Sequence, residues 1–115
     1  MPRKMEVVFL KAEPWRDGRE VAGFFEGVES IPNADSRKIT MNATGKAGSD
    51  FVVWETAALK NLIAQFEPGK FYAIKCIGKK AFKGGTGWNF DVLAFDDGEV
   101  DAAIRKHANK ETLFT

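Results

Sequence analysis

Cysteine and histidine are almost absent from the sequence, which contains one of each, Cys76 and His107. A single cysteine cannot form a disulfide within the chain, and the two residues together are too few for a structural zinc site. One histidine without a matching nucleophile and carboxylate also gives no basis for a catalytic triad. We therefore expect no metal, no cofactor and no enzymatic activity.

Long apolar segments are missing as well. No run approaches the roughly 20 residues that a membrane-spanning helix requires, and the apolar stretch near the start is too short for a secretory signal. These absences predict a cytoplasmic protein without a membrane partner. A chain of 115 residues, 44% of them hydrophobic, can bury one core of ordinary size. Residues 1–115 are therefore expected to form one domain.

The sequence has no excess of either charge, because 17 Lys and Arg residues face 16 Asp and Glu residues. The charges are unevenly distributed, however. Residues 70–83 contain five lysines and no acid, whereas residues 96–101 contain four acids and no base. A nearly neutral molecule with this distribution can present a local positive surface. Such a surface favours a ligand of limited size or a single nucleic-acid strand.

Period-two alternation and β-forming residues predict strands at 20–31, 37–44, 51–54, 70–83 and 88–95, with a glycine turn at 84–87. Glycines within the first of these strands indicate a bend. Leu59, Leu62, Ile63 and Phe66 recur at helical spacing and predict a helix of about three turns, which Thr56 caps. An apolar face over residues 100–110 predicts a short helix near the end of the chain.

Three strands, a helix and two further strands form the element order of the oligonucleotide-binding (OB) barrel. The expected fold is therefore mainly β, a five-stranded OB-fold barrel over about residues 5–96. One helix lies between strands 3 and 4, and a short C-terminal helix follows at about 100–110. Another small α+β sheet with the same elements is the alternative.

Several segments carry a family resemblance. They comprise an aromatic residue before a Thr-Ala-Leu helix start, a Pro-Gly entry to an apolar strand, Gly-Lys-Lys, and an aromatic strand after a glycine turn. In order these are Phe9–Lys11, Glu20–Gly27, Trp54–Leu59, Phe66–Lys70, Gly78–Lys80 and Trp88–Val92. Together they resemble small bacteriophage OB-fold proteins that bind single-stranded DNA, over most of residues 9–95. Unlike many replicative members, the chain ends in HANKETLFT without an acidic tail, so recruitment of partners through such a tail is not expected.

The resemblance implies largely sequence-independent binding of single-stranded DNA in phage replication or recombination, in the host cytoplasm. RNA remains a possible ligand, and a homodimer remains possible. The alternative is an OB-fold module that binds another protein and no nucleic acid.

The strongest candidate site is the segment GKKAFKGGTGW, where Lys79, Lys80 and Lys83 alternate with Phe82 and Trp88. Lysines can follow phosphates while aromatic rings stack on bases. The alternative is a solvated hairpin in which Trp88 belongs to the core.

Further candidates lie elsewhere in the chain. Phe24 and Phe25 are adjacent in a predicted strand and point to opposite faces, so one of them, with Phe24 the candidate, is expected to be a stacking ring. The other candidate cations are Lys38, Lys46 and Lys75. Trp15 fits base stacking and core capping equally, and Trp54, at a strand end, fits packing better.

Overall fold

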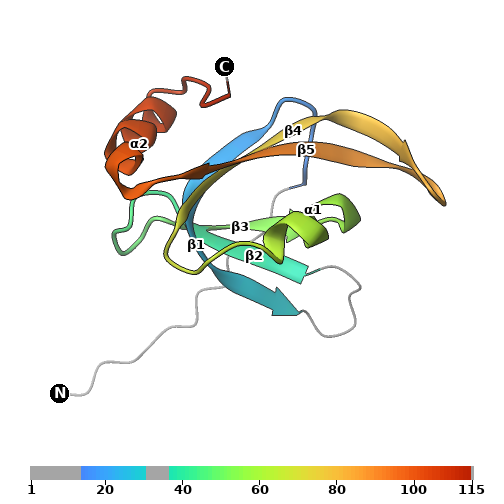
Figure 1. Cartoon of the computed structure of the whole chain (residues 1–115), viewed down its shortest axis with the longest axis horizontal. Coiled ribbons are helices and arrows are strands. Elements are labelled where there is room, and N and C mark those ends of the chain that lie inside the picture. Colours follow the sequence, from blue (N-terminus) through green and yellow to red (C-terminus); the bar gives the residue numbers. More distant parts are fainter. Residues whose placement is uncertain (1–13, 31–36, 115) are drawn as a thin grey trace.

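A computed structural model describes residues 14–30 and 37–114, apart from the side chain of Phe82. Five strands and two α-helices account for most of this part of the chain (Figure 1). In order they are β1 Glu20–Ser30, β2 Arg37–Asn42, β3 Asp50–Glu55, α1 Ala57–Ile63, β4 Phe71–Phe82, β5 Gly85–Phe95 and, after a 3-10 turn at Asp97–Glu99, α2 Val100–Ala108. The predicted mainly-β class, with one helix between strands 3 and 4 and another near the end, is confirmed.

The five strands form one antiparallel sheet in the order β3-β2-β1-β4-β5. Among the described strands no ladder joins β3 to β5, so the sheet is not closed into the barrel that the sequence predicts. The helix α1 follows β3 after the single residue Thr56 and contacts β5. The helix, and not a row of backbone hydrogen bonds, therefore links the two edges. Residues 5–13 of the expected barrel lie outside the described part.

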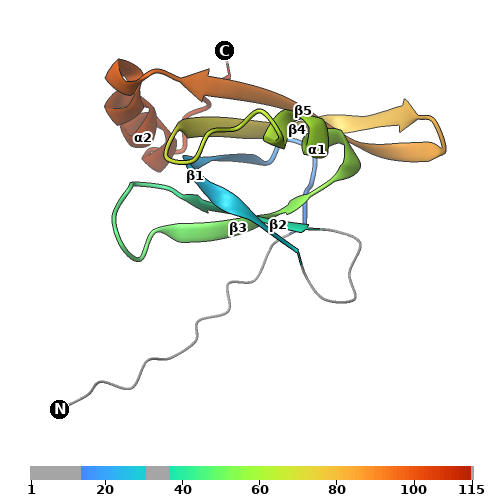
Figure 2. The ribbon, with the colours of Figure 1, turned by 60° about the horizontal axis from the view of Figure 1, so that its bottom comes forward.

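The curved sheet, drawn as a ribbon in Figure 2, has a hydrophobic cluster on each face. The first cluster includes Ile39, Met41 and Val53 from β2 and β3 together with Leu59 and Ile63 from α1. The second cluster lies between the other face and α2. It consists of Ala22, Phe71, Ala73, Val100 and Ala103, with half-buried hydrophobic side chains around them. The alternation predicted for β2 is thus confirmed, and the predicted apolar face of the last helix is buried at Val100 and Ala103.

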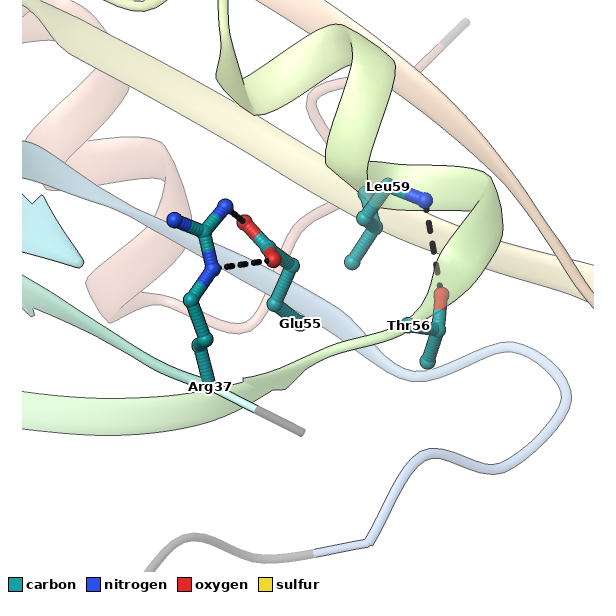
Figure 3. Close-up of polar contacts among 4 residues, drawn as sticks. All are labelled: Arg37, Glu55, Thr56 and Leu59. Carbon is teal, nitrogen blue, oxygen red and sulfur yellow. Dashed lines mark hydrogen bonds and ion pairs between the residues drawn. The ribbon is translucent and has the colours of Figure 1, made fainter. Parts of the chain in front are cut away.

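The helix α1 begins as predicted but ends early. The hydroxyl of Thr56 accepts a hydrogen bond from the backbone N–H of Leu59 at 3.4 Å, which confirms the cap (Figure 3). The helix ends at Ile63, after seven residues, so the prediction of three turns is wrong. The reason lies in β4: the Phe66 ring stacks on Tyr72 with a centroid separation of 3.8 Å. That contact places Phe66 outside the helix.

A paired charge fixes the end of β3 beside this helix. Glu55 accepts two hydrogen bonds from the guanidinium of Arg37, both at 2.7 Å, and its own side chain is only 4% exposed (Figure 3). Hydrogen bonding to Glu55 raises the pKa of Arg37. Bidentate geometry adds directional specificity to the Coulomb attraction, so the pair holds β2 and β3 in register. In the described part of the chain, neither helix has the length and apolarity needed to cross a membrane.

Two glycines of β1 provide a test of the packing. A Cβ on Gly23 would lie 2.7 Å from the backbone carbonyl oxygen of Asn42, whereas one on Gly27, beside the bulge that follows Phe25, would meet no atom within 4 Å. We expect Gly23→Ala to lower the free energy of unfolding by about 1–3 kcal/mol, because β1 and β2 must separate. The matched change Gly27→Ala should cost less than about 0.5 kcal/mol or stabilise the protein. Urea denaturation measures both, and equal losses would contradict this account of β1.

Candidate nucleic-acid interface

The hairpin of β4 and β5 extends beyond α1 and the rest of the sheet (Figure 1). We call its outer part, residues 78–88, the arm. A register shift between Cys76 and Lys79 marks a bulge at its base, where Gly78 has a φ of 94° that favours glycine. The arm closes with a two-residue turn at Lys83 and Gly84, one residue earlier than the predicted turn. The bulge interrupts the ladder between the arm and the rest of the hairpin.

The arm combines cations with an aromatic ring. Lys79 and Trp88 are direct partners across the two strands, and the Lys79 Nζ lies 5.1 Å from the centroid of the Trp88 ring. Lys80 and Lys83 are also exposed, and residues 78–88 include no Asp or Glu. Trp88 is half-buried and packs against the first cluster. The packing of Trp88 agrees with the core alternative, and its role in binding stays a prediction.

The side chain of Phe82 lies outside the described part of the structure. Its backbone is placed, and it pairs with Gly85 beside the turn. The stacking role of Phe82 stays a prediction.

A groove with a volume of about 480 Å³ lies next to the arm on the side of α1. The helix contributes Ala57, Ala58 and Asn61, and the hairpin contributes Lys83, Trp88 and Asn89. Four of these residues, the two alanines and the two asparagines, were not candidates from sequence. Helical spacing identifies only the buried face of α1, and the pairing that brings the hairpin over this helix depends on the whole sheet.

A second lysine and tryptophan meet on β2 and β3. Lys38 and Trp54 are cross-strand partners, and the Lys38 Nζ lies 5.7 Å from the Trp54 ring centroid. Trp54 is half-buried, and it precedes by two residues Thr56, which lines the groove. The candidate cation Lys38 is thus paired with a ring that the sequence assigned to packing.

Trp15 belongs to the core. Its side chain is 5% exposed, its indole N–H donates to the backbone carbonyl of Trp54 at 2.8 Å, and its ring meets Phe90 edge-on at 4.9 Å. Of the two roles left open for Trp15, the structure supports core capping.

Besides Lys38, three further candidate residues lie away from the arm. Phe24 lies on the sheet face opposite Phe25, in edge contact with Phe71 at 5.1 Å. Lys46 lies in the loop 43–49, which is at the far end of the molecule from the arm (Figures 1 and 2). Lys75 pairs in register with Glu20 and Asp91 and lines a cleft beside α2. The nine candidates therefore do not form one continuous surface.

A pocket beside Phe24 contains a carboxylate. It has a volume of 560 Å³ and is lined by Phe24, Glu26, Asn42 and Gly45, among others. Desolvation and the neighbouring carboxylate of Asp50 raise the pKa of Glu26 above its ordinary value of 4.5. Two carboxylates that already disfavour each other's charge also disfavour a phosphate. The electrostatics thus favour the arm over this end of the sheet as a site for a polyanion.

Comparisons with protein-family models, with curated proteins and with solved structures found no match. Within residues 14–30 and 37–114, no three His, Cys, Asp or Glu side chains gather as metal ligands would. The chemistry of this surface is therefore that of exposed lysines, indole rings and side-chain amides.

The pKa of Glu26 leads to a pH-dependence with a defined sign. A carboxyl group whose pKa is raised in the folded state binds its proton more tightly there, so it stabilises the fold at low pH and loses that contribution as the pH rises above 4.5. We expect the free energy of unfolding of the wild type, relative to Glu26→Gln, to fall as the pH rises above 4.5. Urea denaturation of both proteins across this range measures it. A difference that is flat, or that rises with pH, would contradict the assignment.

Proposed function

We propose that this protein binds single-stranded nucleic acid, with DNA as the ligand, through the arm and the adjoining surface near α1. The observation that carries the proposal is the arm itself, where exposed lysines and the Lys79–Trp88 contact occur on a segment without carboxylates. Lysines neutralise phosphates, and an indole face supplies a platform for an unpaired base. A duplex keeps its bases stacked inside, so the ring favours a single strand.

The order of elements supports the same function. The strand order β3-β2-β1-β4-β5 and a helix between β3 and β4 are compatible with an OB barrel that is open between β3 and β5. In the OB fold, the face of strands 2 and 3 and the loop between strands 4 and 5 bind oligonucleotides. The Lys38–Trp54 pair and the arm occupy these two places. We therefore propose an open OB barrel as the fold.

Binding is proposed to be largely independent of sequence, because every base has a face that can stack on an indole ring. The resemblance of the sequence to phage proteins favours DNA replication or recombination as the setting. A matched RNA strand tests the preference for DNA.

We expect the arm lysines to supply much of the salt dependence of binding. Replacing Lys79, Lys80 and Lys83 by Ala should make the negative slope of log affinity against log salt shallower by about 2, since each phosphate contact on a single strand contributes about −0.7. Fluorescence titration of thymidine strands at several salt concentrations measures the slope. The matched control replaces Arg105, Lys106 and Lys110, which lie on and just after α2 at the opposite end from the arm (Figure 1).

Equal effects of the two triple variants would show that only net charge matters and that the arm is not the site. If the wild type binds no strand even at low salt, the proposed function is wrong. The protein-binding module is then the remaining candidate.

A further inference from the structure

The groove between α1 and the arm has the lining that a single nucleobase requires. Trp88 supplies an aromatic surface, and Ala57, Ala58, Gly85 and Gly87 are small enough to leave the groove open. Its volume of 480 Å³ falls within the range of about 300–1,000 Å³ that small-molecule sites occupy. The groove can therefore accept a planar ring beside the indole.

Trp88 lines the groove, whereas the cation beside its ring does not. Lys79, whose Nζ lies 5.1 Å from the ring centroid, is not among the residues that line the groove. A base inside the groove and a phosphate near Lys79 do not compete for the same space.

Two side-chain amides are placed to contact the edge of such a base. Asn89 uses its oxygen to accept the N–H of Phe90 at 3.0 Å, which leaves its NH₂ group as a donor. Asn61 is exposed, and its side chain makes no hydrogen bond within the described part of the chain. Because a carboxamide both donates and accepts, Asn61 can meet the edge of any base.

The charges of the groove suit a nucleotide. Among its lining residues Lys83 is the one cation and none is acidic, whereas the pocket beside Phe24 contains Glu26. An anionic strand is therefore attracted at the mouth of the groove and meets no carboxylate inside it.

We propose that this groove holds one unstacked base of the bound strand, against Trp88 and between Asn61 and Asn89, while Lys79, Lys80 and Lys83 contact the flanking phosphates. The inference rests on the proposed function, since it specifies how the strand engages the arm. In this arrangement the exposed face of α1 is part of the interface, and Ala57 and Asn61 contact the bound nucleobase.

The test compares two ligands with equal charge: a thymidine strand of about 12 nucleotides and an abasic strand of the same length. The wild type should bind the thymidine strand about 5- to 150-fold more tightly, the range for losing base stacking. Ala57→Phe fills the groove from an exposed position of α1. This variant should lose at least about fivefold of the preference while its affinity for the abasic strand is unchanged.

The matched control is Ala102→Phe, which adds the same ring at an exposed position of α2. It should keep the full preference. Thermal melts confirm folding, and Asn61→Phe, also at an exposed position, fills the groove from the next turn if Ala57→Phe lowers the melting temperature.

The outcomes separate the two proposals. If neither strand binds the wild type, the proposed function itself is wrong. If both strands bind and both groove-filling variants keep the wild-type preference, strand binding stands and the base lies elsewhere, which overturns the groove as its site. If the groove-filling variants lose the preference for the thymidine strand and Ala102→Phe keeps it, the result supports the groove as the site of the base.

Discussion

The central strand β1 holds the two halves of the sheet together, because it pairs with β2 along one edge and with β4 along the other. Its close approach to β2 depends on Gly23, where a side chain would collide with the Asn42 carbonyl. Its adjacent phenylalanines serve opposite faces: Phe25 enters the first cluster and Phe24 borders the second. Without these pairings, β4 and β5 would have no fixed position relative to β3 and α1, and the surface around the arm would not exist.

Charge position matters more in this molecule than net charge. The formal charge is +1, yet the arm is free of Asp and Glu, and the carboxylates of Glu26 and Asp50 lie together at another part of the sheet. A polyanion is thus attracted to one end and disfavoured at the other. In the proposed binding mode, this arrangement orients the strand without the strong overall positive charge that would bind nucleic acid nonspecifically over the whole surface.

The sequence predicted those features that depend on local periodicity or on a single cap. Alternation in β2 placed Ile39 and Met41 in the core, and Thr56 marked the start of α1. Features that depend on distant partners could not be predicted. Phe66 fits the helical spacing, but its stacking on Tyr72, a residue of β4, removes it from the helix.

The site was predictable to a similar extent. Composition identified the lysine-rich hairpin, and residue type identified Trp88. The position of Lys79 over the Trp88 ring depends on the bulge after Cys76, and the groove depends on where α1 meets the hairpin. Neither of these is visible in the spacing of residues. The prediction of a closed barrel was wrong for a related reason. The helix α1, and not a strand ladder, lies between β3 and β5, and this depends on how α1 packs.

The arm's construction separates its length from the stability of the body. Beyond the bulge, the strands pair only with each other, from Lys79 with Trp88 to Phe82 with Gly85, and the buried side chains of β4 end at Cys76. Adding or deleting one residue in each strand near the turn keeps the two strands paired, but it moves the side chains beyond that point to the opposite face of the hairpin. Adding or deleting two residues in each strand keeps both the pairing and the face of every side chain. The reach of the arm can therefore vary among descendants of this sequence, in steps of whole cross-strand pairs, while the same core is retained.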